Sequence, residues 1–84
     1  MKYKIAVIGT GSWGTALACA VARNGHEVII WGRNKELCDA INTKHENIPH
    51  LKGYLLHESL VATNDLSFAV GDADIIILAV LRYI

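Results

Sequence analysis

Residues 9–14 of the 84-residue chain read GTGSWG and give the strongest indication of its fold. A nearly continuous apolar run at residues 4–8 precedes it and predicts a short strand that is covered on both faces. After it, apolar residues recur at helical spacing and predict one face of an amphipathic helix, made of Trp13, Ala16, Leu17, Ala20 and Val21. The glycine-rich stretch is therefore expected to connect a strand tightly to a helix.

The three glycines have the spacing G-x-G-x-x-G, and each has a physical task. Gly9 permits the tight turn, Gly11 lets a pyrophosphate approach the backbone, and Gly14 lets the helix lie close on the sheet. Free N–H groups at the start of the helix then bind phosphate oxygens. In this strand–turn–helix context the spacing predicts the dinucleotide-binding turn of a Rossmann-type domain. Ser12 is expected to add a hydrogen bond to a phosphate, while Trp13 packs either on the cofactor or on the helix's own neighbours.

Further apolar runs alternate with helical patterns and predict strands at residues 28–31, 60–62 and 75–80. Such alternation predicts an α/β fold, a Rossmann-type parallel sheet of about four strands with helices on both faces. Because the last run is the most apolar and the chain ends at Ile84, we expect the sheet to be incomplete, with this strand at or near an edge.

Polar and glycine residues predict the helix boundaries. We expect Asn34 to cap the second helix, Thr63 or Asn64 to cap a third, and glycines to end the first and third, at Gly25 and Gly71. Residues 42–59 carry the only proline and show no clean period, which predicts a long, partly irregular connection.

Eight basic residues balance eight acidic ones, which argues against a nucleic-acid partner. No run approaches the roughly 18 apolar residues that a membrane span needs, and the glycine spacing argues against a secretory signal. The four histidines lack metal-ligand spacing, so no metal site is expected. Cys19 and Cys38 are expected to be buried as small hydrophobes, and reduced thiols fit a cytoplasmic protein.

The end of the second strand bears on the choice of cofactor. A site specific for NAD places an acid there on the ribose 2′-hydroxyl, but this sequence has none. Arg33 could instead grip a 2′-phosphate, or it could be a solvated surface residue. We therefore expect NADP or NAD as the cofactor, with NADPH binding at least as well as NADH.

Gly9 to Leu17, reading GTGSWGTAL, closely resembles the opening of bacterial NAD(P)-dependent glycerol-3-phosphate dehydrogenases. The resemblance continues through most of the chain, including the run from Asn42 to Asn47, and reaches Val80. It implies an oxidoreductase that interconverts glycerol 3-phosphate and glycerone phosphate, a phospholipid precursor step. Residues 1–84 would form the N-terminal part of its dinucleotide-binding domain, without the C-terminal substrate domain. Carried over by position, Ser12, Trp13 and Arg33 match the family's dinucleotide contacts.

Two departures from the family's pattern limit what the chain alone is expected to do. The family continues with a proline and a serine-containing loop, whereas this chain ends at Ile84. The lysines that the family uses for catalysis lie further on, and no equivalent is found among Lys2, Lys4, Lys35, Lys44 and Lys52. We therefore expect the chain alone to bind cofactor weakly, if at all, and not to turn over. If it folds alone, we expect its unfinished sheet edge to be covered by another copy.

Two alternatives remain open from the sequence. A Rossmann half can serve as a non-catalytic nucleotide sensor, because fold alone does not imply chemistry. The chain could also begin another dehydrogenase, such as a ketopantoate reductase or a sugar-nucleotide dehydrogenase. The run from Asn42 to Asn47 argues against the latter, although its physical role is not evident from the sequence.

Overall fold

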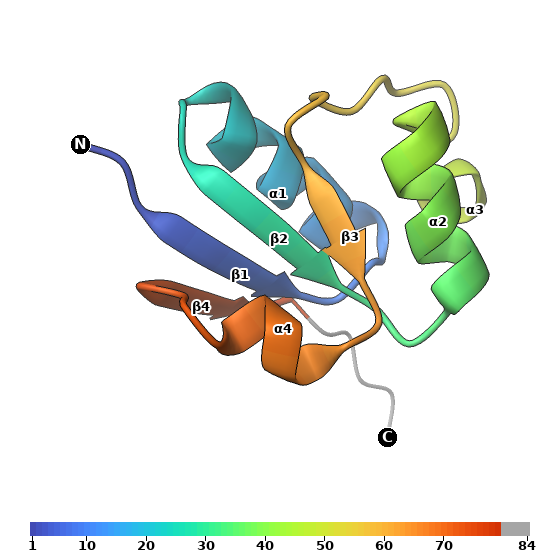
Figure 1. The fold of residues 1–84 in the computed structure, drawn as a ribbon. Helices are drawn as coiled ribbons and strands as arrows, with labels where there is room; N and C mark the ends of the chain where they lie inside the picture. The colour runs from blue at the N-terminus through green and yellow to red at the C-terminus, as the bar shows by residue number, and fades with distance from the viewer. Residues whose placement is uncertain (80–84) are drawn as a thin grey trace.

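The computed structural model describes residues 1–79, which form one sheet of parallel strands (Figure 1). The strand order is β3-β2-β1-β4, and the strands are β1 (Lys4–Ile8), β2 (Glu27–Trp31), β3 (Val61–Thr63) and β4 (Ile75–Leu78). This order confirms the predicted α/β, Rossmann-type fold class and places β4 at an edge, as expected. Val80, which we expected to continue the last strand, lies outside the described residues.

The register brings the carboxyl ends of the strands to one edge of the sheet. Ile8 is level with Trp31 of β2 on one side and with Leu78 of β4 on the other. Trp31 is in turn level with Thr63 of β3. Because all four strands run in the same direction, the segments that follow them emerge side by side, and ligands bind at this edge in open α/β sheets.

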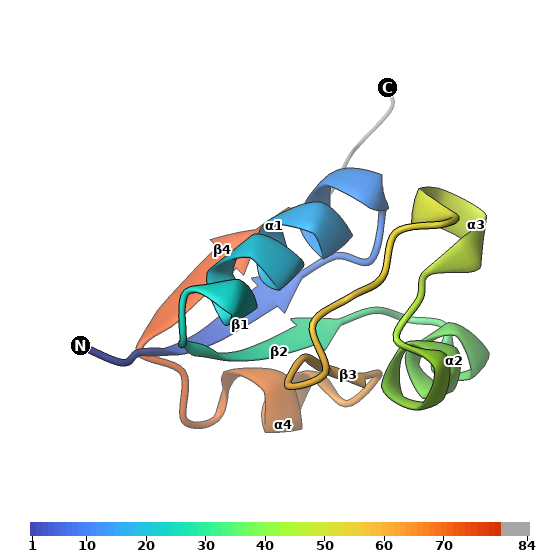
Figure 2. The same cartoon turned by 90° about the horizontal axis from the view of Figure 1, so that it is seen from above.

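Helices lie on both faces of the sheet, as Figure 2 shows. On one face is α1 (Ser12–Arg23), and on the other is α4 (Leu66–Val70). The helix α2 (Lys35–Lys44) packs beside β3, and the short helix α3 (Ile48–Leu51) contacts α1. The sequence pattern missed α3, because it has a single turn with a proline near its start and no buried residue to give it a period.

The predicted buried face of α1 is wrong. Trp13 is 61% exposed, and the buried residues of α1 are a different set: Gly14, Thr15, Ala18, Cys19 and Ala22. These residues are small, so the helix axis can lie close to β1 and β2. The larger apolar side chains of α1 sit at the margins of the contact, which the period of apolar residues could not reveal.

Most predicted helix boundaries agree with the structure. Gly25 has a φ of +91° after the end of α1, and the Asn34 side chain accepts from the Leu37 N–H at the start of α2. The prediction for α4 is wrong at its start, because Asp65 caps it through the Phe68 N–H. Thr63 instead accepts a hydrogen bond from the Asp65 N–H, which fixes the cap itself.

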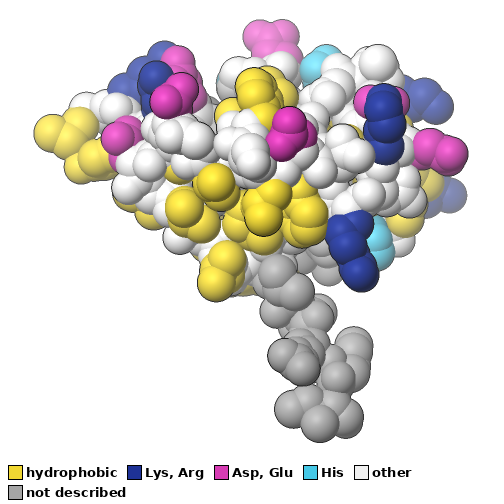
Figure 3. Space-filling view, turned by 60° about the horizontal axis from the view of Figure 1, so that its bottom comes forward, with side chains coloured by type: hydrophobic (Ala, Val, Ile, Leu, Met, Phe, Trp, Pro, Cys, Tyr) yellow, Lys and Arg dark blue, Asp and Glu magenta, His cyan; other side chains and the backbone are white. Residues whose placement is uncertain are grey.

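The core lies mainly between α1 and the two central strands. Val7, Ile30 and Ile41 are fully buried, and both cysteines are buried free thiols, as predicted. Burial is also the main reason why the pKa of the Cys38 thiol is raised. By contrast β4 is largely exposed, with 51% of Ile76 and 74% of Leu78 accessible. Hydrophobic side chains accordingly gather in a band on the β4 and α4 side of the molecule (Figure 3).

Candidate functional site

An open cleft of about 540 Å³ lies at the carboxyl edge of the sheet. It brings together every residue that the sequence predicted for cofactor binding: Gly9, Gly11, Ser12, Trp13, Gly14 and Arg33. The sequence did not predict its other lining residues: Thr10, Trp31, Gly32, His50, Leu78 and Ala79. The volume falls within the range of small-molecule sites, roughly 300–1,000 Å³.

The turn that leads out of β1 is held by the sheet itself. Gly9 has a φ of +132°, which side chains rarely adopt, so a glycine is needed there. Its N–H donates to the Trp31 carbonyl at 2.8 Å and so extends the ladder between β1 and β2 by one step. The hydrogen bond to β2 therefore fixes the position of the first residue of the turn.

Gly14 and Gly11 serve different needs. A Cβ on Gly14 would lie 2.6 Å from the Gly9 carbonyl oxygen and 3.1 Å from the Ala79 Cβ, so only glycine lets α1 approach the turn and the end of β4. A Cβ on Gly11 would meet no protein atom within 4 Å. The space in front of Gly11 is therefore open to a ligand that comes close to the backbone.

The start of α1 offers free donors to this space. Among residues 1–79 the N–H groups of Gly11, Ser12 and Trp13 have no acceptor, and no side chain caps the helix. The first turn also carries no acidic residue. Free N–H groups and the positive end of the helix dipole favour an anion such as a phosphate at this point.

Behind the turn lies a buried polar network that the sequence analysis missed. Asn47, which immediately precedes α3, donates through Nδ2 to the Thr10 carbonyl and to the Thr15 hydroxyl, both at 2.8 Å. Asn47 and Thr15 are fully buried. The sequence marked Asn47 only as the end of a run that resembles the family, and a contact across 37 residues cannot be predicted from that resemblance.

The end of β2 packs directly on the turn. A Cβ on Gly32 would lie 2.5 Å from the Thr10 Cγ2, so the Thr10 side chain occupies the space that a larger residue would need. The Gly32 N–H donates to the Thr63 carbonyl at 3.1 Å, which extends the β2–β3 ladder. The glycine turn and the end of β2 therefore pack against each other on one side of the cleft.

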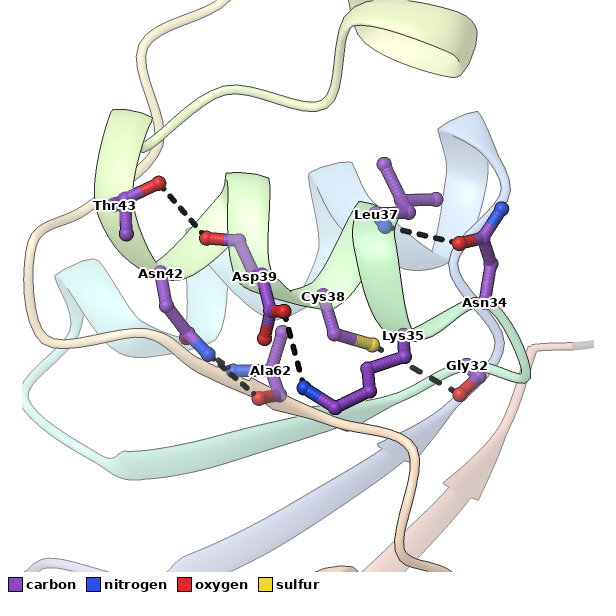
Figure 4. A network of polar contacts seen from close by, with 9 residues as sticks. All are labelled: Gly32, Asn34, Lys35, Leu37, Cys38, Asp39, Asn42, Thr43 and Ala62. Carbon is purple, nitrogen blue, oxygen red and sulfur yellow. Dashed lines mark hydrogen bonds and ion pairs between the residues drawn. The ribbon is translucent and has the colours of Figure 1, made fainter.

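The two neighbours of Arg33 in the sequence, Gly32 and Asn34, are each held by a hydrogen bond (Figure 4). The preceding Gly32 carbonyl accepts from the Cys38 thiol at 3.8 Å, and the following Asn34 caps α2. The exposed Arg33 side chain lines the cleft, as does His50 from α3. No described residue lining the cleft is acidic, so its ionisable groups favour a negatively charged ligand.

A second hollow of about 400 Å³ lies at the opposite, amino-terminal edge of the sheet, between β1, β2 and α4. Its lining includes Lys4, Glu27 and Phe68 but not the glycine turn. The helix beside it, α4, is only five residues long, and Asp65 caps its start. The residues with free N–H groups at the start of α1 line the first cleft and do not line this second hollow.

Two further expectations concern absences. In the described part of the chain no group of three metal-ligating side chains comes together. Among those same residues no helix is both long and apolar enough to cross a membrane.

A parallel sheet with a G-x-G-x-x-G turn between its first strand and first helix defines a Rossmann-type dinucleotide domain. The chain belongs to the NAD-dependent glycerol-3-phosphate dehydrogenase N-terminus family, whose model matches residues 4–82. This membership confirms the resemblance seen in the sequence and removes the alternative of a ketopantoate reductase or a sugar-nucleotide dehydrogenase.

Relatives and solved structures agree with this membership. A glycerol-3-phosphate dehydrogenase [NAD(P)+] of Enterococcus faecalis is 52% identical over 80 residues, which are 95% of this chain and 24% of the relative. The structure of the glycerol-3-phosphate dehydrogenase from Saccharomyces cerevisiae aligns with a TM-score of 0.87 and 36% identity over 95% of this chain and 26% of its own. The structure of the glycerol-3-phosphate dehydrogenase from Coxiella burnetii aligns with a TM-score of 0.83 and 35% identity. The alignment covers 92% of this chain and 24% of that structure's chain. The chain thus spans about a quarter of the length of the relatives it matches.

Proposed function

We propose that this chain forms the N-terminal part of the dinucleotide-binding domain of an NAD(P)-dependent glycerol-3-phosphate dehydrogenase. The observation that carries the proposal is the open space in front of Gly11, bordered by N–H groups without acceptors. A diphosphate placed there would meet the donors that α1 leaves free. Family membership supports the same assignment.

Each predicted site residue then has a role in binding. The N–H groups of Gly11, Ser12 and Trp13 hold the diphosphate, and the Ser12 hydroxyl adds a hydrogen bond. Trp13 packs on the cofactor; its 61% exposure at the rim of the cleft supports this role over packing on the helix. Gly9 and Gly14 shape the turn. When bound, the nicotinamide ring supplies hydride chemistry.

Arg33 favours the phosphorylated cofactor. Its side chain lines the cleft at the end of β2, where a dinucleotide domain places the adenine ribose. No described lining residue offers a carboxylate to the ribose hydroxyls, whereas a guanidinium matches a 2′-phosphate. NADPH is therefore expected to bind at least as tightly as NADH.

The relatives' name supports glycerol 3-phosphate as one substrate of the whole enzyme, and the resemblance of the sequence implies glycerone phosphate as the other member of the pair. Its reaction supplies a phospholipid precursor in the cytoplasm, where the two free thiols stay reduced. No lysine among the described residues lines the cleft. We expect the groups that move the proton and hold the substrate phosphate to lie outside the described lining of the cleft, so the 84 residues alone should not turn over.

The exposed β4 strand would let copies of this chain associate. Its outer edge pairs with no described strand, and Ile75, Ile76 and Leu78 are each more than 40% exposed. An unpaired apolar edge is a template for pairing with another chain. We expect a second copy to cover this edge when the 84 residues are present alone.

The test of the cofactor assignment is a titration of the purified chain with NADPH and with NADH, followed by isothermal calorimetry. Saturable binding of both, with NADPH at least equal, is the expected result. Inorganic pyrophosphate should compete, since it occupies the same donors. Failure of both cofactors to bind at millimolar concentration would remove the proposal.

A further inference from the structure

The buried Asn47 side chain lies directly behind the turn that faces the cleft. Its Nδ2 group is 2.8 Å from the Thr10 carbonyl oxygen and 2.8 Å from the Thr15 hydroxyl. Thr15 itself lies 3.3 Å from the same carbonyl and can donate to it. The Thr10 carbonyl is thus held from behind by donors on two segments that are far apart in the sequence.

The orientation of the Asn47 amide follows from its partners. A carbonyl oxygen can only accept, so the amide atom that faces Thr10 must be the nitrogen. Its two protons then match its two acceptors, whereas Oδ1 has no partner among residues 1–79. The amide is therefore positioned entirely by what it donates to the turn.

This contact controls the direction of a backbone donor. The peptide bond between Thr10 and Gly11 is trans, so its C=O and N–H point in opposite directions. Because the carbonyl points inward to Asn47, the Gly11 N–H must point outward, to the open space of the cleft. Rotation of this peptide would turn a carbonyl oxygen toward the bound phosphate and repel it.

We propose that Asn47 is a positioning residue for the dinucleotide, which fixes the Thr10–Gly11 peptide with its N–H aimed at the diphosphate. The inference rests on the proposed cofactor function and deepens it. It also gives a physical role to the run from Asn42 to Asn47. Asn42 joins α2 to β3, Glu46 accepts from the Gly53 N–H, and Asn47 braces the turn.

The connection between α2 and β3 delivers Asn47 to this place. The carbonyl of Asn47 accepts from the Leu51 N–H at 2.7 Å, which forms the single turn of α3. The following chain returns to α2, where the Leu56 N–H donates to the His45 carbonyl at 2.8 Å. Hydrogen bonds therefore hold the backbone on both sides of Asn47, and they keep the Asn47 side chain in contact with the turn.

The test compares Asn47→Ala with Asn42→Ala in the full chain. Both asparagines anchor the same connection with two side-chain hydrogen bonds, but only Asn47 touches the turn. Under conditions where both variants are folded, Asn47→Ala should bind NADPH and ADP about ten-fold more weakly, whereas Asn42→Ala should bind like the unmodified chain. The affinity for 2′-AMP, which has no diphosphate, should be unchanged in both.

Two outcomes would overturn the role of Asn47, and a third would instead overturn the proposed cofactor function. Equal affinity of Asn47→Ala and the unmodified chain for NADPH would overturn the role of Asn47 alone. An equal loss for 2′-AMP and NADPH would show a merely structural effect and would overturn it as well. Absence of binding to the unmodified chain would instead remove the proposed cofactor function.

A measurement on the unmodified chain keeps the proposal testable if Asn47→Ala does not fold. A scalar coupling across the hydrogen bond from Asn47 Nδ2 to the Thr10 carbonyl carbon should be detectable by NMR. Addition of ADP should then shift the Gly11 amide proton more than that of any residue outside the turn. An unshifted Gly11 amide in a chain that binds ADP would contradict the proposal.

Discussion

Gly11 and Gly14 lie three residues apart in the same turn but have different surroundings. An added Cβ would touch backbone at Gly14 and nothing at Gly11. Gly11 also has ordinary backbone angles, with φ at −68° and ψ at 178°, so another residue could adopt them. Packing of α1 on the turn thus favours glycine at position 14, whereas the proposed diphosphate site is what would need glycine at position 11.

The two alanine variants should therefore have opposite effects. Gly14→Ala should lower the free energy of unfolding by about 1–3 kcal/mol, because a backbone oxygen must move. Gly11→Ala should keep or raise the stability by up to about 1 kcal/mol, yet lose at least ten-fold in NADPH affinity, because its methyl group fills the diphosphate space. Urea denaturation and cofactor titration check both. Undiminished NADPH binding by Gly11→Ala would argue against a diphosphate at this turn.

Arg33 is the residue that should separate the two cofactors. Arg33→Ala should weaken NADPH binding by about ten-fold and leave NADH binding within two-fold, because only NADPH carries the 2′-phosphate. Lys35→Ala is the control, since Lys35 is a nearby exposed cation that pairs with Asp39 at 3.2 Å. Equal losses for NADPH and NADH would mean that Arg33 contributes only general charge.

Among the helices and strands, α2 is hydrogen-bonded to β3 through the side chain of Asn42. The Asn42 amide donates to the Ala62 carbonyl at 2.9 Å and accepts from the Ala62 N–H at 2.8 Å, as a neighbouring strand would (Figure 4). The outer edge of β3 is therefore satisfied without another strand. This contact explains how a strand of three residues stays ordered at the sheet edge.

Asn42→Ala should lower the free energy of unfolding by about 1–2 kcal/mol, because it removes two hydrogen bonds to the β3 backbone. Its neighbour Thr43 bonds only to Asp39 within the same helix, so Thr43→Ala should change stability by less than about 0.5 kcal/mol. Urea denaturation monitored by circular dichroism would compare them. Equal midpoints for the two variants would show that the Asn42 contact stabilises nothing.

At the scale of the whole molecule, the two sheet edges differ. Asn42 satisfies the edge of β3, whereas no described residue outside β1 pairs with β4. The exposed apolar side chains of β4 add a hydrophobic surface to its unpaired backbone. Association of copies should therefore involve β4 and leave β3 free.

Light scattering at rising concentration should show dimers or larger species of the 84-residue chain. Ile76→Lys should shift the distribution to the monomer, because a charged side chain at the β4 edge opposes pairing. Val61→Lys is the matched control, since Val61 is 42% exposed on the other edge strand. A chain that stays strictly monomeric at high concentration would contradict the proposed association.

The extent of prediction differed between local and distant features. The short apolar runs and the glycine spacing predicted all four strands, because a run of apolar residues bounded by turn residues is a local signal. Gly25 and Asn34 were predicted as caps for the same reason, since capping uses atoms within a few residues. The face of α1 was predicted wrongly, because burial there depends on the sheet that the helix meets.

The residue pattern alone predicted the four strands, the helices α1, α2 and α4, the glycine turn and the family resemblance, but it missed α3. Each of these features depends on which residue types lie a few positions apart, because backbone angles and steric limits link close neighbours in the chain. The buried side of α1, the cleft that Arg33 shares with the turn, and the contact between Asn47 and the turn became visible only in the folded structure. These features join atoms far apart along the chain, so their geometry exists only once the sheet has assembled and its connections have closed over it.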